Sequence, residues 1–74
     1  MGAVETMPAE RTQANFSKLP GLLTRAEFQH WTGLSDGELD EGVKSGEIGF
    51  RRLRNGGYRK YFKSEAARIA GFEF

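Results

Sequence analysis

Apolar residues recur at helical spacing in two neighbouring segments near the middle of the chain. Phe28 and Trp31 stand three residues apart, and Leu39 and Val43 stand four apart. Side chains at these spacings share one face of a helix, and the residues between them are mostly polar. The pattern therefore predicts two short amphipathic helices, each of which buries one face.

Both predicted helices carry start and stop signals. Residues 24–27 (TRAE) and 35–38 (SDGE) each form a capping box, whose hydroxyl and carboxylate satisfy free backbone N–H groups at the helix start. Gly33 and Gly46 follow the apolar faces, and glycine readily takes the left-handed conformation that ends a helix. We therefore expect the helices to end at about residues 32 and 45. Two capped helices joined by so short a turn describe a helix-turn-helix, with Leu34 filling the core at the turn.

Residues 50–63 (FRRLRNGGYRKYFK) are predicted to form a β-hairpin. Asn55-Gly56-Gly57 separates its two halves, and Asn-Gly is a strong signal for a tight turn whose central residues need positive φ. The hairpin carries no acidic residue and six cations, which are Arg51, Arg52, Arg54, Arg59, Lys60 and Lys63. The positive field of these cations would attract a phosphate backbone. The alternative function for the charges is to protect a solvated edge hairpin from aggregation. Tyr58, Tyr61 and Phe62 lie among these cations. We expect them to pack on the core and across the strands, and stacking on single-stranded bases is the less favoured alternative.

The segments at either end of the chain are less regular. Ser64 is expected to cap a short third helix that closes at Gly71, with Phe72 and Phe74 beyond it either folded onto the core or exposed. Residues 1–20 lack a sustained hydrophobic period, so we expect a mostly disordered arm before a domain of residues 21–74. Phe16 and Leu19 of the arm are candidates for packing on the domain edge. The expected core is Leu23, Phe28, Trp31, Leu34, Leu39, Val43, Ile48, Phe50, Leu53, Tyr61, Phe62 and Ile69.

The formal net charge of +1 conceals an asymmetry between the two parts of the chain. Residues 1–49 hold four Lys or Arg and eight Asp or Glu, a balance of −4, whereas residues 50–74 hold seven and two, a balance of +5. We therefore expect an anionic partner for the C-terminal part.

The composition also argues against several classes of protein. With no cysteine and one histidine (His30), the chain offers no disulfide, no metal site and no nucleophile–base–acid set, so we expect neither an enzyme nor a cofactor. No apolar run approaches the ~20 residues of a membrane span, and the N-terminus does not resemble a signal peptide. We expect a cytoplasmic protein with no membrane or small-molecule partner.

Four motifs between Leu22 and Ala70 occur in a distinctive order. They are Leu23-Thr24 with Glu27, Gly33-Leu34-Ser35, Gly46-Glu47-Ile48, and Arg59-Lys60-Tyr61 followed by Ser64. In this order they resemble the excisionase family, small winged-helix relatives of the MerR DNA-binding domain. Members of that family open on Leu-Thr-x-x-Glu, turn at Gly-aliphatic-Ser, and enter a basic wing through Gly-Glu-Leu.

The resemblance implies a small, mainly α, α/β winged helix-turn-helix with two capped helices, a two-stranded basic hairpin as the wing, and a short third helix. It implies double-stranded DNA as the partner, with the second helix in the major groove and the wing along the backbone or minor groove. Many such proteins bend attachment-site DNA and direct a tyrosine recombinase (integrase) toward excision of a prophage or another mobile element. Others are small transcriptional regulators. The resemblance also implies a bacterial or phage protein that is associated with the nucleoid. It further implies possible self-association on adjacent DNA sites.

Candidate DNA contacts fall into three sets. The wing set is Arg51, Arg52, Arg54, Asn55, Arg59 and Lys60. The second-helix set, for the major groove, is Ser35, Asp36, Gly37, Asp40, Glu41 and Lys44. Thr24 and Arg25 of the first helix are candidates for the DNA backbone.

The second helix departs from the family pattern because it is acidic where relatives carry polar and basic residues. Phosphates would repel its carboxylates, which can read a base only by accepting a hydrogen bond from cytosine N4. We favour a solvated face, with Glu38 used in capping and Asp36 placed favourably at the helix dipole. Two alternatives stay open: DNA binding that relies on the wing, and a protein-binding adaptor that docks a basic partner on the acidic helix.

Overall fold

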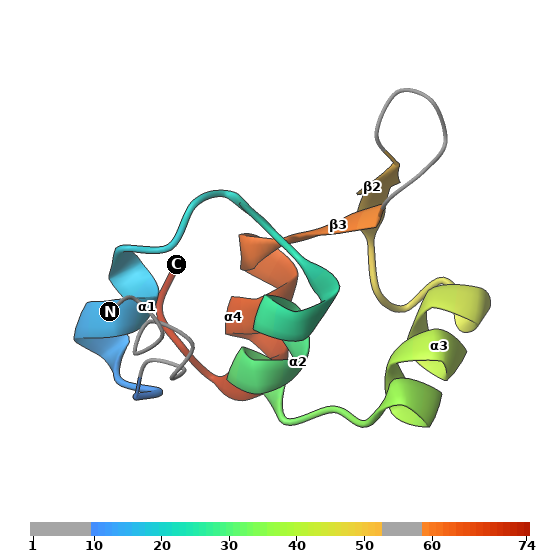
Figure 1. The fold of residues 1–74 in the computed structure, drawn as a ribbon, viewed down its shortest axis with the longest axis horizontal. Helices are drawn as coiled ribbons and strands as arrows, with labels where there is room; N and C mark the ends of the chain where they lie inside the picture. Colours follow the sequence, from blue (N-terminus) through green and yellow to red (C-terminus); the bar gives the residue numbers. More distant parts are fainter. Residues whose placement is uncertain (1–9, 53–58) are drawn as a thin grey trace, which may run out of the picture.

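The computed structural model describes residues 10–52 and 59–74, and within them the chain forms four helices and three strands (Figure 1). In chain order these are α1 (Gln13–Ser17), β1 (Leu22–Leu23), α2 (Arg25–Thr32), α3 (Asp36–Ser45), β2 (Phe50–Arg52), β3 (Arg59–Phe62) and α4 (Lys63–Ala70). The strands form one antiparallel sheet in the order β1-β3-β2. The expected α/β class is therefore confirmed.

Helices α2 and α3 begin and end where their local signals predict. The Thr24 hydroxyl accepts from the Glu27 N–H at 3.1 Å, and the Thr24 N–H donates to the Glu27 carboxylate at 2.9 Å. The second box has the same two bonds, at 3.2 and 2.9 Å. Gly33 and Gly46 take the left-handed conformation, with φ of 77° and 88°. These boundaries are set locally, because each cap supplies partners for free backbone groups.

The sheet is larger than predicted, because the hairpin strands are joined by a third strand. In the hairpin, Phe50 pairs with Tyr61, Arg51 with Lys60, and Arg52 with Arg59. This is the register that a two-residue turn at Asn55-Gly56 requires, although the predicted turn itself lies outside the described residues. The predicted two-stranded hairpin is present, but it is not the whole sheet: β1, which was not predicted, adds to the free edge of β3 and places Leu22 opposite Phe62.

Helix α4 begins two residues earlier than predicted, at Lys63. Its N-cap is Phe62, which makes no side-chain capping bond, so the predicted Ser64 cap is wrong. The reason is the sheet: the Lys63 N–H donates to the Gly21 carbonyl at 2.9 Å, and the strand therefore leads directly into the helix. The predicted end is confirmed, since Gly71 closes the helix with φ of 85°.

The prediction of disorder is wrong for the part of the arm that the structure describes. Thr12 caps α1, and Phe16 within α1 is completely buried. The Phe16 ring stacks on Phe72 with centroids 4.6 Å apart and meets the edge of Trp31 at 5.6 Å. These partners are distant in sequence, so the local pattern could not reveal them. The rest of the predicted arm, residues 1–9, lies outside the described residues.

The core agrees with most of the predicted set. Among the expected residues, those buried are Leu23, Phe28, Trp31, Leu39, Ile48 and Tyr61, and those packed on them while partly buried are Leu34, Val43, Phe50 and Ile69. Ala66 and Ala67 are buried although they were not expected in the core, and Phe16, expected only as a candidate for packing on the domain edge, is completely buried. Phe62 is only half-buried because it alternates with Tyr61 onto the other face of the sheet, and Leu53 lies outside the described residues. Phe72 folds onto the core and Phe74 is 79% exposed.

Candidate nucleic-acid interface

The hairpin brings four cations into two pairs of like charge. Arg51 lies directly opposite Lys60, and Arg52 lies directly opposite Arg59. Like charges at opposed positions destabilise a sheet by amounts comparable to the ~0.2–1 kcal/mol that favourable cross-strand pairs contribute. The arrangement therefore gains stability from any anion that binds between or beside these side chains.

Phe50 supports one of the two pairs. Side chains alternate along a strand, so Arg52 and Arg59 lie on the same sheet face as Phe50 and the buried Tyr61. The guanidinium carbons of Arg59 and Arg52 lie 5.2 and 5.9 Å from the centre of the Phe50 ring. Each such cation–π contact contributes about 0.5–1 kcal/mol at an exposed site, which offsets part of the repulsion between the two charges.

The cations of the hairpin lack acidic partners within residues 10–52 and 59–74. The ion pairs in this part of the chain join Arg25 to Asp36 and Asp40, and Arg68 to Glu65. None of these pairs involves β2 or β3, so the positive field of the hairpin is not neutralised by the carboxylates that the structure describes. The two other predicted wing contacts, Arg54 and Asn55, lie outside the described residues.

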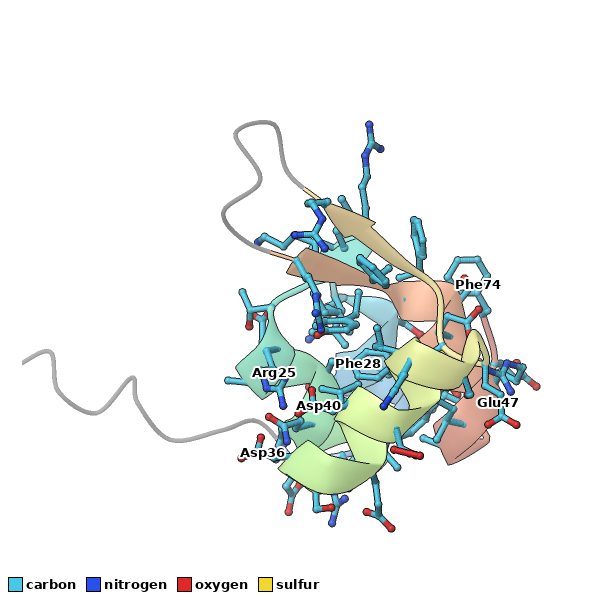
Figure 2. All side chains as sticks on the ribbon, turned by 90° about the vertical axis from the view of Figure 1, so that its right-hand side faces the viewer. Arg25, Phe28, Asp36, Asp40, Glu47 and Phe74 are labelled. Carbon is cyan, nitrogen blue, oxygen red and sulfur yellow. The ribbon has the colours of Figure 1, made fainter. Side chains whose placement is uncertain are left out.

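The acidic face of α3 is tied to α2 through Arg25. Its two terminal nitrogens donate to Asp36 and Asp40, each at 3.1 Å. Figure 2 shows the three side chains beside one another. Gln29 also donates to Asp36, at 2.9 Å. The Gln29 and Arg25 hydrogen bonds, in that order, lower the pKa of Asp36, and the two carboxylates raise the pKa of Arg25. The face is therefore not simply solvated: part of its charge joins the two helices.

These contacts change the roles of several predicted site residues. The hydroxyls of Thr24 and Ser35 are used in the capping boxes, and Arg25 is held by carboxylates in place of a phosphate. The prediction that Glu38 serves in capping is confirmed; its bonds with the Ser35 backbone and hydroxyl lower its pKa. The other second-helix candidates are exposed, and two of them, Asp36 and Asp40, are paired with Arg25; the set is Asp36, Gly37, Asp40, Glu41 and Lys44. Sequence reasoning missed Gln29 and Phe50 as supports, because their partners lie across a turn or across a strand.

The hairpin and α3 lie at one end of the molecule, and α1 and the C-terminal end lie at the other (Figure 1). A shallow hollow at that other end is lined by Ser17, Lys63, Glu73 and Phe74.

In the described part of the chain no three His, Asp or Glu side chains gather as a metal site would need. No helix among the described residues is long and apolar enough to cross a membrane.

Comparisons with known proteins do not identify a relative. No protein-family model matches the chain, no curated protein is significantly similar to it, and no solved structure matches it.

Proposed function

We propose that the chain is a DNA-binding protein in which α2 and α3 act as a helix-turn-helix and the β2–β3 hairpin acts as its wing. One observation carries the proposal: cations face each other across the hairpin, Arg51 opposite Lys60 and Arg52 opposite Arg59. None of the four has a carboxylate partner among the described residues. Repeating negative charge at close spacing is what a duplex backbone offers to such a ribbon. The position of α3 at the same end of the molecule supports the proposal.

The ion pairs of Arg25 reduce the objection that α3 is acidic. Asp36 and Asp40 of α3 both form ion pairs with Arg25 of α2 and share its positive charge. The repulsion between this part of α3 and a phosphate backbone is therefore weaker than the sequence suggests. The wing supplies most of the attraction, and α3 supplies what base reading there is through exposed positions.

By its resemblance to the excisionase family, the proposed biological role is that of a recombination directionality factor. In this role the protein binds and bends attachment-site DNA and so favours excision of a mobile element by a tyrosine recombinase. A small transcriptional regulator of a phage or mobile element is the alternative with the same DNA-binding surface. A footprint on the DNA that flanks the gene separates the two: protection within an attachment site supports the first role, and protection confined to a promoter supports the second.

An adaptor that binds a basic protein is the rival function, and one observation favours it. The side chains of Asp36 and Asp40 stay 80% and 61% exposed although they are paired with Arg25, so the face remains open to a partner. Asp40→Asn distinguishes the two functions. For a DNA-binding protein it removes a charge near the phosphates and loosens Arg25, so affinity for random duplex should rise.

The test is a fluorescence anisotropy titration of duplex DNA with the wild type and Asp40→Asn at two salt concentrations. Binding that weakens with salt, and is tightened by the substitution, supports the proposal. Absence of salt-sensitive duplex binding by the wild type would overturn it in favour of the adaptor.

A further inference from the structure

The two sides of the hairpin present their cations in different ways. On the side that faces the core, a series of aromatic rings leads outward: Phe28 stacks on Tyr61 at 4.9 Å, and Tyr61 lies 6.5 Å from Phe50. Phe28 and Tyr61 are buried, so the Phe50 ring at the end of this series is braced by the core. Arg52 and Arg59 lie against that ring.

The opposite side of the hairpin has no such support in the described chain. Arg51 and Lys60 lie there with Leu22 and Phe62, and neither cation contacts an aromatic ring or a carboxylate among the described residues. Arg51 is exposed, and its long side chain keeps its rotational freedom. This pair can adapt to a charged surface but is not held ready for one geometry.

We propose that Phe50 is a positioning residue that holds Arg52 and Arg59 in a fixed arrangement for hydrogen bonding to DNA, while Arg51 and Lys60 contribute charge alone. The inference rests on the proposed function. A guanidinium that stacks on a ring through its face keeps its N–H donors free at its edge, where they bind phosphate or groove acceptors in defined directions. Prior ordering of the side chains lowers the entropy lost on binding.

Lysine substitution separates geometry from charge. Arg52→Lys with Arg59→Lys keeps both positive charges and removes the planar donors, and Arg51→Lys is the matched control on the other side. The double variant should lose about tenfold in affinity for duplex DNA, equivalent to about 1.4 kcal/mol, because lysine cannot replace the planar, directed donors of arginine. Its salt dependence should be unchanged because its charge is unchanged. Arg51→Lys should bind within about twofold of the wild type.

A second pair of variants tests the ring itself. Phe50→Leu keeps an apolar side chain but removes the ring, and Phe50→Tyr keeps the ring. In NMR spectra of the free protein, Phe50→Leu should shift the side-chain N–H resonances of Arg52 and Arg59 and leave that of Arg51 unmoved. Phe50→Leu should also reproduce the affinity loss, and Phe50→Tyr should not.

The outcomes are distinct. Wild-type affinity in the double lysine variant, or unmoved arginine resonances in Phe50→Leu, would overturn the positioning role and leave DNA binding by the wing intact. Failure of the wild type to bind duplex DNA would overturn the proposed function, and the positioning role with it. If the double lysine variant does not fold, the comparison of Phe50→Leu with Phe50→Tyr decides the matter by the same two readouts.

Discussion

At the scale of single residues, the two glycines within α3, Gly37 and Gly42, differ in the space around them. A methyl group at Gly42 would lie 2.4 Å from Cδ1 and 2.9 Å from Cγ1 of the buried Ile48, whereas Gly37 has open space around it. Gly42→Ala should destabilise the protein by about 1–3 kcal/mol through overpacking. Gly37→Ala should stabilise it by up to about 1 kcal/mol through helix propensity. Urea unfolding of both variants measures the difference, and equal stabilisation would show that Ile48 moves aside freely.

Two carboxylates of α3 link stability to pH. Their pKa values are lowered in the folded protein from ordinary values of 3.8 for Asp36 and 4.5 for Glu38, by hydrogen bonds from Gln29 and Arg25 and from Ser35 respectively. A lowered folded pKa contributes stability that is present above the unfolded value and is lost as the pH falls through the folded one. The free energy of unfolding should therefore decline as the pH falls below 4.5.

The matched variants Asp36→Asn and Glu38→Gln identify the source of this decline. Each should reduce stability at neutral pH and make it less dependent on pH in the acid range, measured as urea midpoints from neutral to acid pH. A pH profile identical to that of the wild type in both variants would assign the decline to other carboxylates.

At the scale of elements, α1 shows how a short segment is stabilised by its contacts. Gln13 exchanges two hydrogen bonds with the backbone of Glu73, at 3.1 and 2.8 Å, and Phe16 fills the space between Trp31 and Phe72. Phe16→Ala should lower stability by about 3–5 kcal/mol, as for other buried aromatic residues. Gln13→Ala, which removes only exposed hydrogen bonds, should cost about 0.5–1.5 kcal/mol. Thermal unfolding compares them, and similar small losses would mean that α1 contributes little to the core.

Elements with local signals could be predicted, and those that depend on distant partners could not. The boundaries of α2 and α3 follow from a cap and a glycine within the same stretch of chain, which is why Thr24, Gly33, Ser35 and Gly46 were informative. Strand β1 has two residues, too few for a period, and forms only because the edge of β3 pairs with it. The ion pairs of Arg25 cross the turn to residues 11 and 15 positions away, so no helical spacing reveals them.

At the scale of the whole molecule, lysine residues lie at both ends. The hairpin carries Lys60 at one end, and the exposed Lys18 follows α1 at the other. A single small module buries only about 600–1,000 Å² of protein surface on DNA, so a monomer should bind weakly and several copies on adjacent sites should be needed. Affinity per protomer then depends mainly on counterions released by the wing.

Binding of DNA by the wing should depend steeply on salt concentration. If the wing contacts about five phosphates, log K should fall against log salt with a slope of about −4 to −5 per protomer, since each phosphate contributes about −0.9. Lys60→Ala should weaken binding to all duplex sequences and reduce the slope by about 1. Lys18→Ala removes the same charge at the other end and should change neither quantity. Anisotropy titrations over a range of salt measure both. Equal effects of the two substitutions would mean that the net charge of the molecule, and not the hairpin, determines the attraction to DNA.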